Sequence, residues 1–289
     1  AAVAMLVDAG QLNWDAPVLD YLPEFQLYDA LVTRQVTLRD LLAHRLGLAT
    51  WGGDLTWYGS TYSLAEVLRR MRYQPPAYAF RTDFGYCNLA FMTAGLIVER
   101  VSGVPFGQFL DERIFKPLGM ARTRASTLQL PGIENVAAPH TLVNGMLAPV
   151  PYRVTDNNTA AGGILSSVNE LSRWLRMQLN EGVWQGQRLI SPSALEIMRT
   201  PHTLVVRPAE MRALNPLIHL SAYGLGFQLA DYRGHLMLQH GGALDGMLSM
   251  SAILPEEGLG VVVLTNADNH LMHNSALYTL VDAALGLGD

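Results

Sequence analysis

The chain has 289 residues, of which 49% are hydrophobic and 16% are charged, so it can bury a large core and is not disordered. The formal net charge is -5 and no basic stripe is present, which argues against nucleic acid as the main partner. The single cysteine, Cys87, excludes an internal disulfide and a cysteine-rich zinc site. No apolar run in the sequence is long enough for a membrane span. Lys116 is the only lysine, so all other basic residues are arginines.

Helices are predicted from apolar spacing and from residues that begin or end helices. The first covers residues 1–9 and ends at Gly10; because it has no N-cap, we expect the chain to start inside a longer helix. Ser167 and Glu170 have the spacing of a capping box. Residues 121–160 have little periodicity and are expected to be an extended excursion. Further helices are expected over residues 37–44, 64–71, 87–101, 106–115, 167–179, 191–198 and 269–285.

The last quarter of the chain has strand-like runs that are separated by turn residues. Strands are expected over residues 226–231, 235–239, 249–254 and 261–265. Residues 261–264 are apolar on both faces, which predicts a covered, interior strand. Helices followed by an antiparallel meander and a closing helix indicate an α+β fold.

Tyr86 and Asn88 stand at the start of a predicted helix and are the first candidate site. Free N–H groups at a helix start favour a phenolate, which can accept a proton, and an asparagine amide can both donate and accept hydrogen bonds. The structural alternative is a packed tyrosine beside an asparagine that helps to cap the helix.

Residues 239–243 (QHGGA), at the end of a predicted strand, are the second candidate site. The two glycines allow another molecule to approach the backbone, and the Ala243 N–H could then face a developing oxyanion. The structural alternative is a bulge or hairpin bend with His240 on the surface.

Other patterns carry less chemistry. The glycine pair within residues 160–167 is expected to form a cavity wall, and His44 and Cys87 are expected to be packing residues. His270 and His273 could share a metal, but no acidic or cysteine partner has the right offset. The sequence contains neither Gly-x-Ser-x-Gly nor Ser-x-x-Lys.

The order of the motifs is more specific than any one of them. The chain resembles the serine β-lactamase-related family on the class C β-lactamase side, which includes esterases, D-aminopeptidases and penicillin-binding proteins. The resemblance runs from end to end of the chain. It rests on residues 41–48 (LLAHRLGL), 86–88 (YCN), 97–103 (IVERVSG), 114–120 (IFKPLGM), 161–167 (AGGILSS), 223–227 (YGLGF), 240–242 (HGG) and 254–266 (LPEEGLGVVVLTN).

The resemblance implies a β-lactamase/transpeptidase-like fold, in which an antiparallel sheet flanked by helices packs beside a helical lobe. It implies one domain over residues 1–289, with a helical lobe at roughly 20–200 and a sheet lobe at roughly 220–289 together with helix 1–9. The family's first helix and two strands would be missing. We therefore expect an N-terminally incomplete domain whose strand 261–265 has an unpaired edge.

In that family three motifs meet in one cleft, and the first is a Ser-x-x-Lys nucleophile. By the family's spacing this serine should lie roughly eight residues before Ala1. The resemblance makes Tyr86 the catalytic proton relay and Asn88 a ligand of the substrate carbonyl or amide. His240 would hold the tyrosine and the polar end of the substrate, and Gly242 and Ala243 would shape the oxyanion hole.

The sequence departs from the family pattern at several places. His240 replaces the lysine that β-lactamases commonly carry, which favours esterase or peptidase activity over β-lactam hydrolysis. Residues 80–84 (FRTDF) replace a frequent Pro-Gly. Trp51, Trp57 and Tyr58 are expected either to line the mouth of the site, which would suit an apolar acyl group, or to pack within their loop.

The sequence thus predicts a fragment of a serine hydrolase that cleaves ester or amide bonds in a small molecule or peptide through an acyl-enzyme. No metal or organic cofactor is implied, and the family resemblance suggests a periplasmic or secreted location. One alternative is an inactive ligand-binding module that retains the cleft. Another is a metal-assisted hydrolase that uses His270 and His273.

Overall fold

The computed structural model describes residues 1–288 and has the expected mixed α+β architecture. Within these residues the main sheet has six antiparallel strands in the spatial order β10-β9-β8-β7-β6-β5. The strands are β5 (Thr203–Leu204), β6 (Ile218–Tyr223), β7 (Gln228–Tyr232), β8 (His235–Leu244), β9 (Met247–Leu254) and β10 (Leu259–Thr265).

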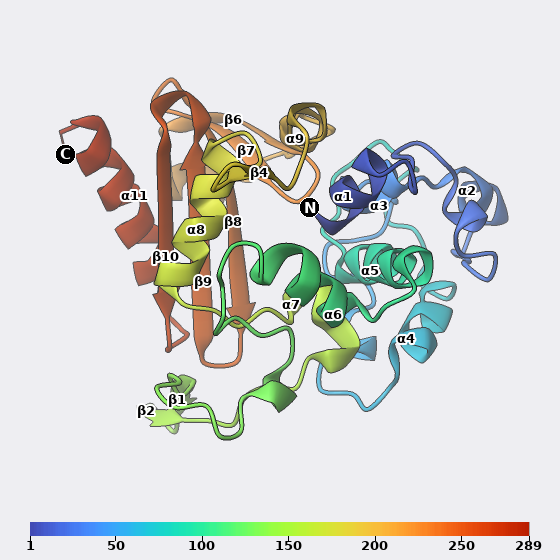
Figure 1. Ribbon diagram of the computed structural model, residues 1–289, viewed down its shortest axis with the longest axis horizontal. Helices are drawn as coiled ribbons and strands as arrows, with labels where there is room; N and C mark the ends of the chain where they lie inside the picture. Colours follow the sequence, from blue (N-terminus) through green and yellow to red (C-terminus); the bar gives the residue numbers. More distant parts are fainter. Residues whose placement is uncertain (289) are drawn as a thin grey trace.

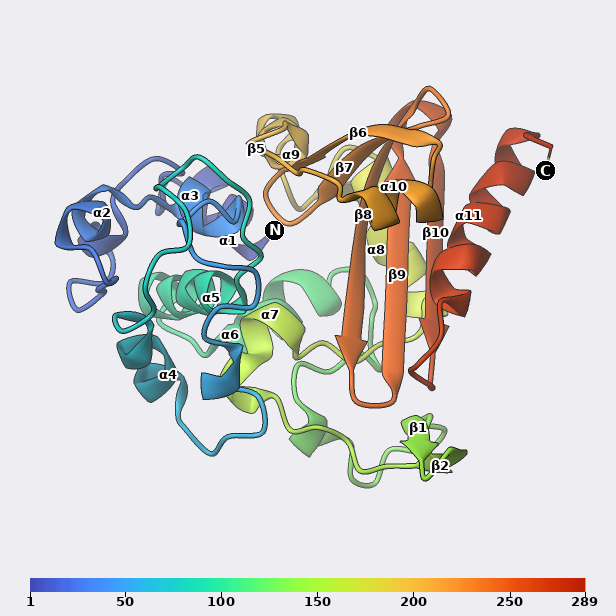
Figure 2. The ribbon, with the colours of Figure 1, turned by 180° about the vertical axis from the view of Figure 1, so that it is seen from behind.

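One long helix covers each face of this sheet. Helix α8 (Val168–Leu179) packs on one face and α11 (Met272–Leu285) on the other (Figures 1 and 2). Gly260 of β10 makes room for α8, since a Cβ atom at this glycine would lie 3.2 Å from the Leu175 Cβ. On the other face, Leu277 and Val281 of α11 are fully buried against the sheet.

Strand β10 is therefore covered on both faces, as predicted, but it is not an interior strand. Among residues 1–288 only β9 pairs with it, so β10 forms one edge of the sheet. This arrangement agrees with the expectation of an unpaired edge at residues 261–265.

The remaining helices form a second part of the molecule beside the sheet (Figures 1 and 2). The N-terminus, at the start of α1, lies between these helices and the sheet. These helices are α1 (Ala2–Asp8), α2 (Ala30–Gln35), α3 (Leu38–Leu42), α4 (Leu64–Met71), α5 (Asn88–Ser102), α6 (Phe106–Leu110), α7 (Thr159–Gly162) and α9 (Pro192–Arg199), while the short α10 (Ala209–Leu214) lies near β6.

The division into two lobes that the sequence suggested remains a prediction. Two helices lie in a different part of the molecule from the lobe to which this division assigned them. Helix α8 packs on the sheet, although it falls within the predicted helical lobe of residues 20–200. Helix α1 contacts α5 and shares its hydrophobic core, although helix 1–9 was expected to belong to the sheet lobe.

The local signals for helix ends are mostly confirmed. Thr37 and Asp40 form a complete capping box at the start of α3. At α8 only half of the predicted box is present, because the Ser167 hydroxyl accepts from the Glu170 N–H at 3.4 Å. The Glu170 carboxylate instead accepts from the Thr123 hydroxyl, at 2.6 Å, and so joins α8 to another segment.

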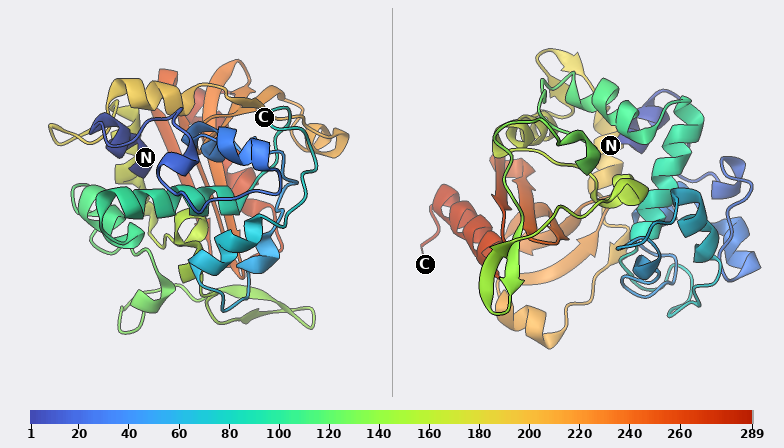
Figure 3. Two further views of the ribbon diagram at one scale, coloured as in Figure 1. Left: turned by 90° about the vertical axis from the view of Figure 1, so that its right-hand side faces the viewer. Right: turned by 90° about the horizontal axis from the view of Figure 1, so that it is seen from below.

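Several elements differ from the sequence-based expectation. The excursion over residues 121–160 contains a hairpin, β1 (His140–Val143) and β2 (Met146–Pro149), which projects beyond the end of the main sheet (Figure 3). Strand β8 does not end at residue 239 but continues to Leu244. Strands β5 and β6 and the small hairpin of β3 (Val183–Trp184) and β4 (Gln187–Arg188) were not predicted.

Within residues 1–288 no single helix is long and apolar enough to cross a membrane. One bent helix pair, Asn88–Ser102 with Phe106–Phe115, meets the length and composition criteria, with a bend of 78° between its parts.

Candidate active site

The second half of β8 presents an open backbone edge. Strand β7 pairs with β8 only as far as Gln239, whereas β9 pairs with it as far as Leu244. Two-residue turns join β8 to both neighbours, and hydrogen-bonding direction alternates along an antiparallel strand. The N–H and C=O groups of Gly241 and Ala243 therefore point away from β9, toward the side of β8 where pairing with β7 has ended. Both residues are exposed, so the Ala243 N–H can donate to a ligand at this edge.

A tightly held loop places Tyr86 directly before α5. The Gly85 N–H donates to the His44 carbonyl at 2.9 Å, and the Tyr86 carbonyl accepts from the Trp51 N–H at 2.7 Å. A Cβ atom at Gly85 would lie only 1.8 Å from the Leu48 carbonyl oxygen, so this close approach requires glycine.

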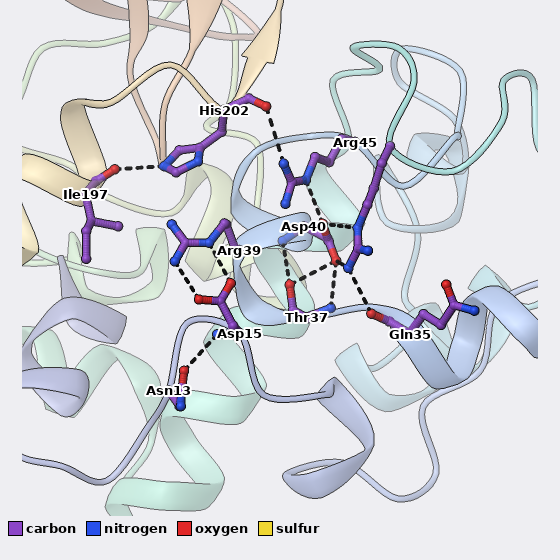
Figure 4. A network of polar contacts seen from close by, with 10 residues as sticks. Asn13, Asp15, Gln35, Thr37, Arg39, Asp40, Arg45, Ile197 and His202 are labelled. Carbon is purple, nitrogen blue, oxygen red and sulfur yellow. Dashed lines mark hydrogen bonds and ion pairs between the residues drawn. The ribbon is translucent and has the colours of Figure 1, made fainter.

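A buried ion cluster fixes the segment that leads into this loop (Figure 4). The fully buried Asp40 carboxylate accepts from Arg45 at 2.6 Å and from Arg81 at 2.7 Å. Burial alone would raise the pKa of Asp40, but hydrogen bonds from Arg81, the Thr37 N–H and Arg45 lower it overall. Arg81 also donates its backbone N–H to the Arg45 carbonyl at 3.0 Å, so the cluster anchors residues 80–84 on α3.

Tyr86 lies near two histidines. Its ring centroid is 4.4 Å from that of His44 and 6.1 Å from that of His240. Burial, followed by the negative charges of Asp54 and Cys87, raises the pKa of Tyr86 to about 12. The expectation of a phenolate stabilised by the helix start is therefore wrong for these residues, since α5 begins two residues later and burial disfavours the charged phenol.

Asn88 is bound to an acidic residue that the sequence analysis missed. Its Nδ2 group donates to Asp54 Oδ2 at 2.7 Å, and Trp57 Nε1 donates to Asp54 Oδ1 at 2.9 Å. Burial raises the pKa of Asp54, although these two hydrogen bonds oppose the shift. The alternative that Asn88 caps the helix is wrong, since Cys87 is the N-cap residue of α5. Asp54 begins a short 3-10 helix (Asp54–Thr56) far from Asn88 in the sequence, and no local pattern signals the contact.

His240 uses both ring nitrogens within the protein. Its Nδ1 lies 2.7 Å from the Gly241 carbonyl oxygen, and its Nε2 lies 3.0 Å from the Tyr223 hydroxyl. His240 was expected to hold Tyr86, but the tyrosine that hydrogen-bonds to it is Tyr223. The alternative of a bend with an exposed histidine is also wrong, because β8 passes straight through this partly buried residue. Burial lowers the pKa of His240.

Cys87 and His44 are packing residues, as expected. Cys87 is fully buried, and burial raises the pKa of its thiol to about 12, so it is a poor nucleophile. Its backbone N–H donates to His44 Nδ1 at 3.0 Å. Burial and the neighbouring His240 lower the pKa of His44 to about 3.

The three aromatic residues proposed for the mouth of the site have different environments. Trp57 is only 6% exposed and packs within the loop beside Asp54, whereas Trp51 is 67% exposed. The Tyr58 hydroxyl donates to Asp245, in the turn that follows β8, and Arg153 Nε donates to the same carboxylate at 3.0 Å. Tyr58 therefore lies at the turn end of the open β8 edge.

The remaining candidate residues lie away from this site. Lys116 is exposed and pairs with Asp111 at 2.8 Å. His270 and His273 have ring centroids 5.9 Å apart, and residues 1–288 contain no group of three or more His, Cys, Asp or Glu that could hold a metal ion. Of residues 160–167, Ala160 borders a cavity of about 280 Å³ between α5, α6 and α7.

Comparison with known proteins agrees with this fold. The family model described as Beta-lactamase matches residues 1–285. The unguisins hydrolase ungD' of Aspergillus campestris is 28% identical over 299 residues, which cover 99% of this chain and 54% of that protein. Penicillin-binding protein 4 of Amycolatopsis lactamdurans is 30% identical over 275 residues, which cover 91% of this chain and 68% of that protein.

A solved structure shows the same architecture. The octameric penicillin-binding protein homologue from Pyrococcus abyssi superposes with a TM-score of 0.82 at 26% identity, over 99% of this chain and 63% of that chain. This chain spans about half the length of the fungal relative. Because the family model matches residues 1–285, the chain belongs to the beta-lactamase family.

Proposed function

We propose that the protein is a serine hydrolase that cleaves ester or amide bonds of a small-molecule or peptide substrate through an acyl-enzyme. The observation that carries this proposal is the convergence of the loop before α5 with the open edge of β8. Tyr86 and His240 are far apart in the sequence, yet their ring centroids lie 6.1 Å apart. Asn88 and the Ala243 N–H flank this pair on the same two segments.

Each residue has a role that fits its position. Tyr86 relays the proton between the nucleophile and the leaving group. The Asn88 amide, oriented by Asp54, binds the substrate carbonyl or amide. Ala243 donates its backbone N–H to the oxyanion, and Gly242 keeps the strand surface open for the substrate. His240 forms the wall of the site opposite Tyr86.

The nucleophile in this proposal is the serine of a Ser-x-x-Lys that lies outside the 289 residues. Two observations support it. Lys116 is the only lysine in the sequence, and the residue three positions before it is Arg113. The start of α1 lies between the helical part and the sheet (Figure 1). A lysine ammonium placed beside Tyr86 would lower the high pKa of its phenol.

A ligand-binding module without catalysis is the second candidate. One observation favours it. At the site, residues 1–288 supply the neutral phenol of Tyr86 and the partly buried, neutral imidazole of His240, but no Ser-x-x-Lys. A chelator tests the alternative of a metal-assisted hydrolase that uses His270 and His273. It would abolish the turnover of such an enzyme.

Hydrolysis of phenyl esters by the protein from its natural source, with and without Tyr86→Phe, tests the proposal. We expect Tyr86→Phe to lower kcat by about 10²–10⁴-fold with little change in KM, because the ring remains while the relay is lost. Tyr73→Phe, at an exposed tyrosine, is the matched control. Absence of turnover in the unchanged protein would favour the binding module.

A further inference from the structure

Tyr223 is a buried tyrosine at the end of β6 to which the proposed function gives no role. It is only 3% exposed and begins the Tyr223–Phe227 motif. Its ring packs 4.7 Å, centroid to centroid, from that of His44, which in turn contacts Tyr86. Its hydroxyl reaches out of this aromatic cluster to His240 Nε2 at 3.0 Å.

The two hydrogen bonds of His240 fix its tautomer. The Gly241 carbonyl oxygen can only accept, so the Nδ1 atom at 2.7 Å from it carries the hydrogen. A neutral imidazole has one N–H, which leaves Nε2 as the acceptor and makes the Tyr223 hydroxyl the donor. Neither nitrogen of His240 is then free to bind a substrate.

Within residues 1–288, the other titratable groups beside His240 do not supply a cation. They are Tyr86 from the loop before α5, Tyr223 from β6 and His44 from the turn after α3. Burial keeps both tyrosines as neutral phenols and both histidines as neutral imidazoles at neutral pH. A carboxylate beside His240 would therefore lose hydration without gaining a charged partner from residues 1–288.

We propose that Tyr223 is a positioning residue that locks His240 as a neutral ring with no free N–H, and that the site thereby selects substrates whose group beside His240 is uncharged. The selectivity for uncharged substrates rests on the proposed hydrolase function. The tautomer of His240 does not depend on that function. Tyr223 acts through His240 and does not touch the substrate.

Nitrogen-15 NMR of the histidine-labelled full-length protein tests the locked tautomer directly. We expect the His240 signals, assigned with His240→Gln, to show a protonated Nδ1 and an unprotonated Nε2. They should stay unchanged down to a pH below the ordinary histidine pKa of about 6.5. A protonated Nε2, or titration near that value, would overturn the proposal whether or not any variant folds.

Tyr223→Phe keeps the ring and removes only the hydroxyl. Losing a hydrogen bond to the neutral form should raise the pKa of His240 by on the order of one unit. Tyr232→Phe is the matched control, because it removes another buried tyrosine hydroxyl, one that donates to Asp282 at 2.8 Å. An equal effect of both variants on the His240 signals would contradict the specific role of Tyr223.

Two esters with the same acyl group test the selectivity in the protein from its natural source. Phenyl acetate and its meta-carboxy derivative differ by one carboxylate on the leaving phenol. We expect kcat/KM to be at least about tenfold higher for the uncharged ester. Tyr223→Phe should reduce this ratio of kcat/KM values, and the change should appear in KM rather than in kcat. Equal rates for the two esters, or a ratio that Tyr223→Phe leaves unchanged, would refute the selectivity.

Failure to hydrolyse either ester would instead refute the proposed function, and the NMR result would still decide the role of Tyr223.

Discussion

At the residue scale, His44 connects the site to the acid stability of the protein. The pKa of His44 is lowered by burial to about 3, while the unfolded chain has the ordinary value of about 6.5. Between these values the unfolded state binds a proton that the folded state does not. We therefore expect the unfolding free energy to fall as the pH drops from 6.5 towards 3, by up to about 1.4 kcal/mol per pH unit from this residue.

His44→Asn tests this expectation, because its side-chain oxygen can still accept from the Cys87 N–H. Urea unfolding of the two proteins at pH 8, 6 and 5 should show a shallower loss of stability for the variant. His219→Asn, at an exposed histidine, should leave the pH dependence unchanged. The same pH dependence for the original protein and His44→Asn would contradict this account.

The site was only partly predictable at this scale. Tyr86, Asn88 and His240 could be named because each stands in a short motif, and the structure brings their segments together. Asp54 and Tyr223 could not be assigned a role, because their partners are distant in the sequence and the contacts exist only after folding. The phenolate expectation failed because a motif does not report how deeply its tyrosine is buried.

At the element scale, the Asp40 cluster holds the loop that carries Tyr86. Asp40→Asn keeps the size of the side chain but leaves Arg45 and Arg81 without their carboxylate. We expect a loss of stability on the order of 3 kcal/mol in urea unfolding, because Asp40 is fully buried while Arg81 is partly exposed. Asp15→Asn, which breaks the more exposed pair with Arg39, should cost less than about 1 kcal/mol. Equal losses for the two variants would show that the cluster does not anchor the loop.

Helices were predicted better than strands because their signals are local. The cap at Thr37 and the glycine at position 103 correctly mark the start of α3 and the end of α5. Strands β5 and β6 were missed, because their stability comes from pairing with each other and with β7 rather than from their own pattern. The length of β8 was underestimated for a similar reason: pairing with β9 continues through the two glycines.

At the scale of the whole molecule, β10 is the exposed edge of the sheet. It has seven residues, its faces are covered by α8 and α11, and its outer backbone groups have no strand partner within residues 1–288. Because such an edge can pair with another chain, we expect the isolated 289 residues to self-associate. Light scattering should give a mass that rises with concentration. A monomer with reversible, cooperative unfolding would contradict this expectation.

The proposed hydrolase needs a Ser-x-x-Lys that these 289 residues lack, and a further segment that carried it could also pair with the edge of β10. The most direct test is the intact mass of the protein from its natural source, before and after reaction with a fluorophosphonate probe. We predict a mass well above 31.7 kDa and one probe adduct, which peptide mapping places on a serine outside this sequence. A mass of 31.7 kDa without an adduct would contradict the account and favour the binding module.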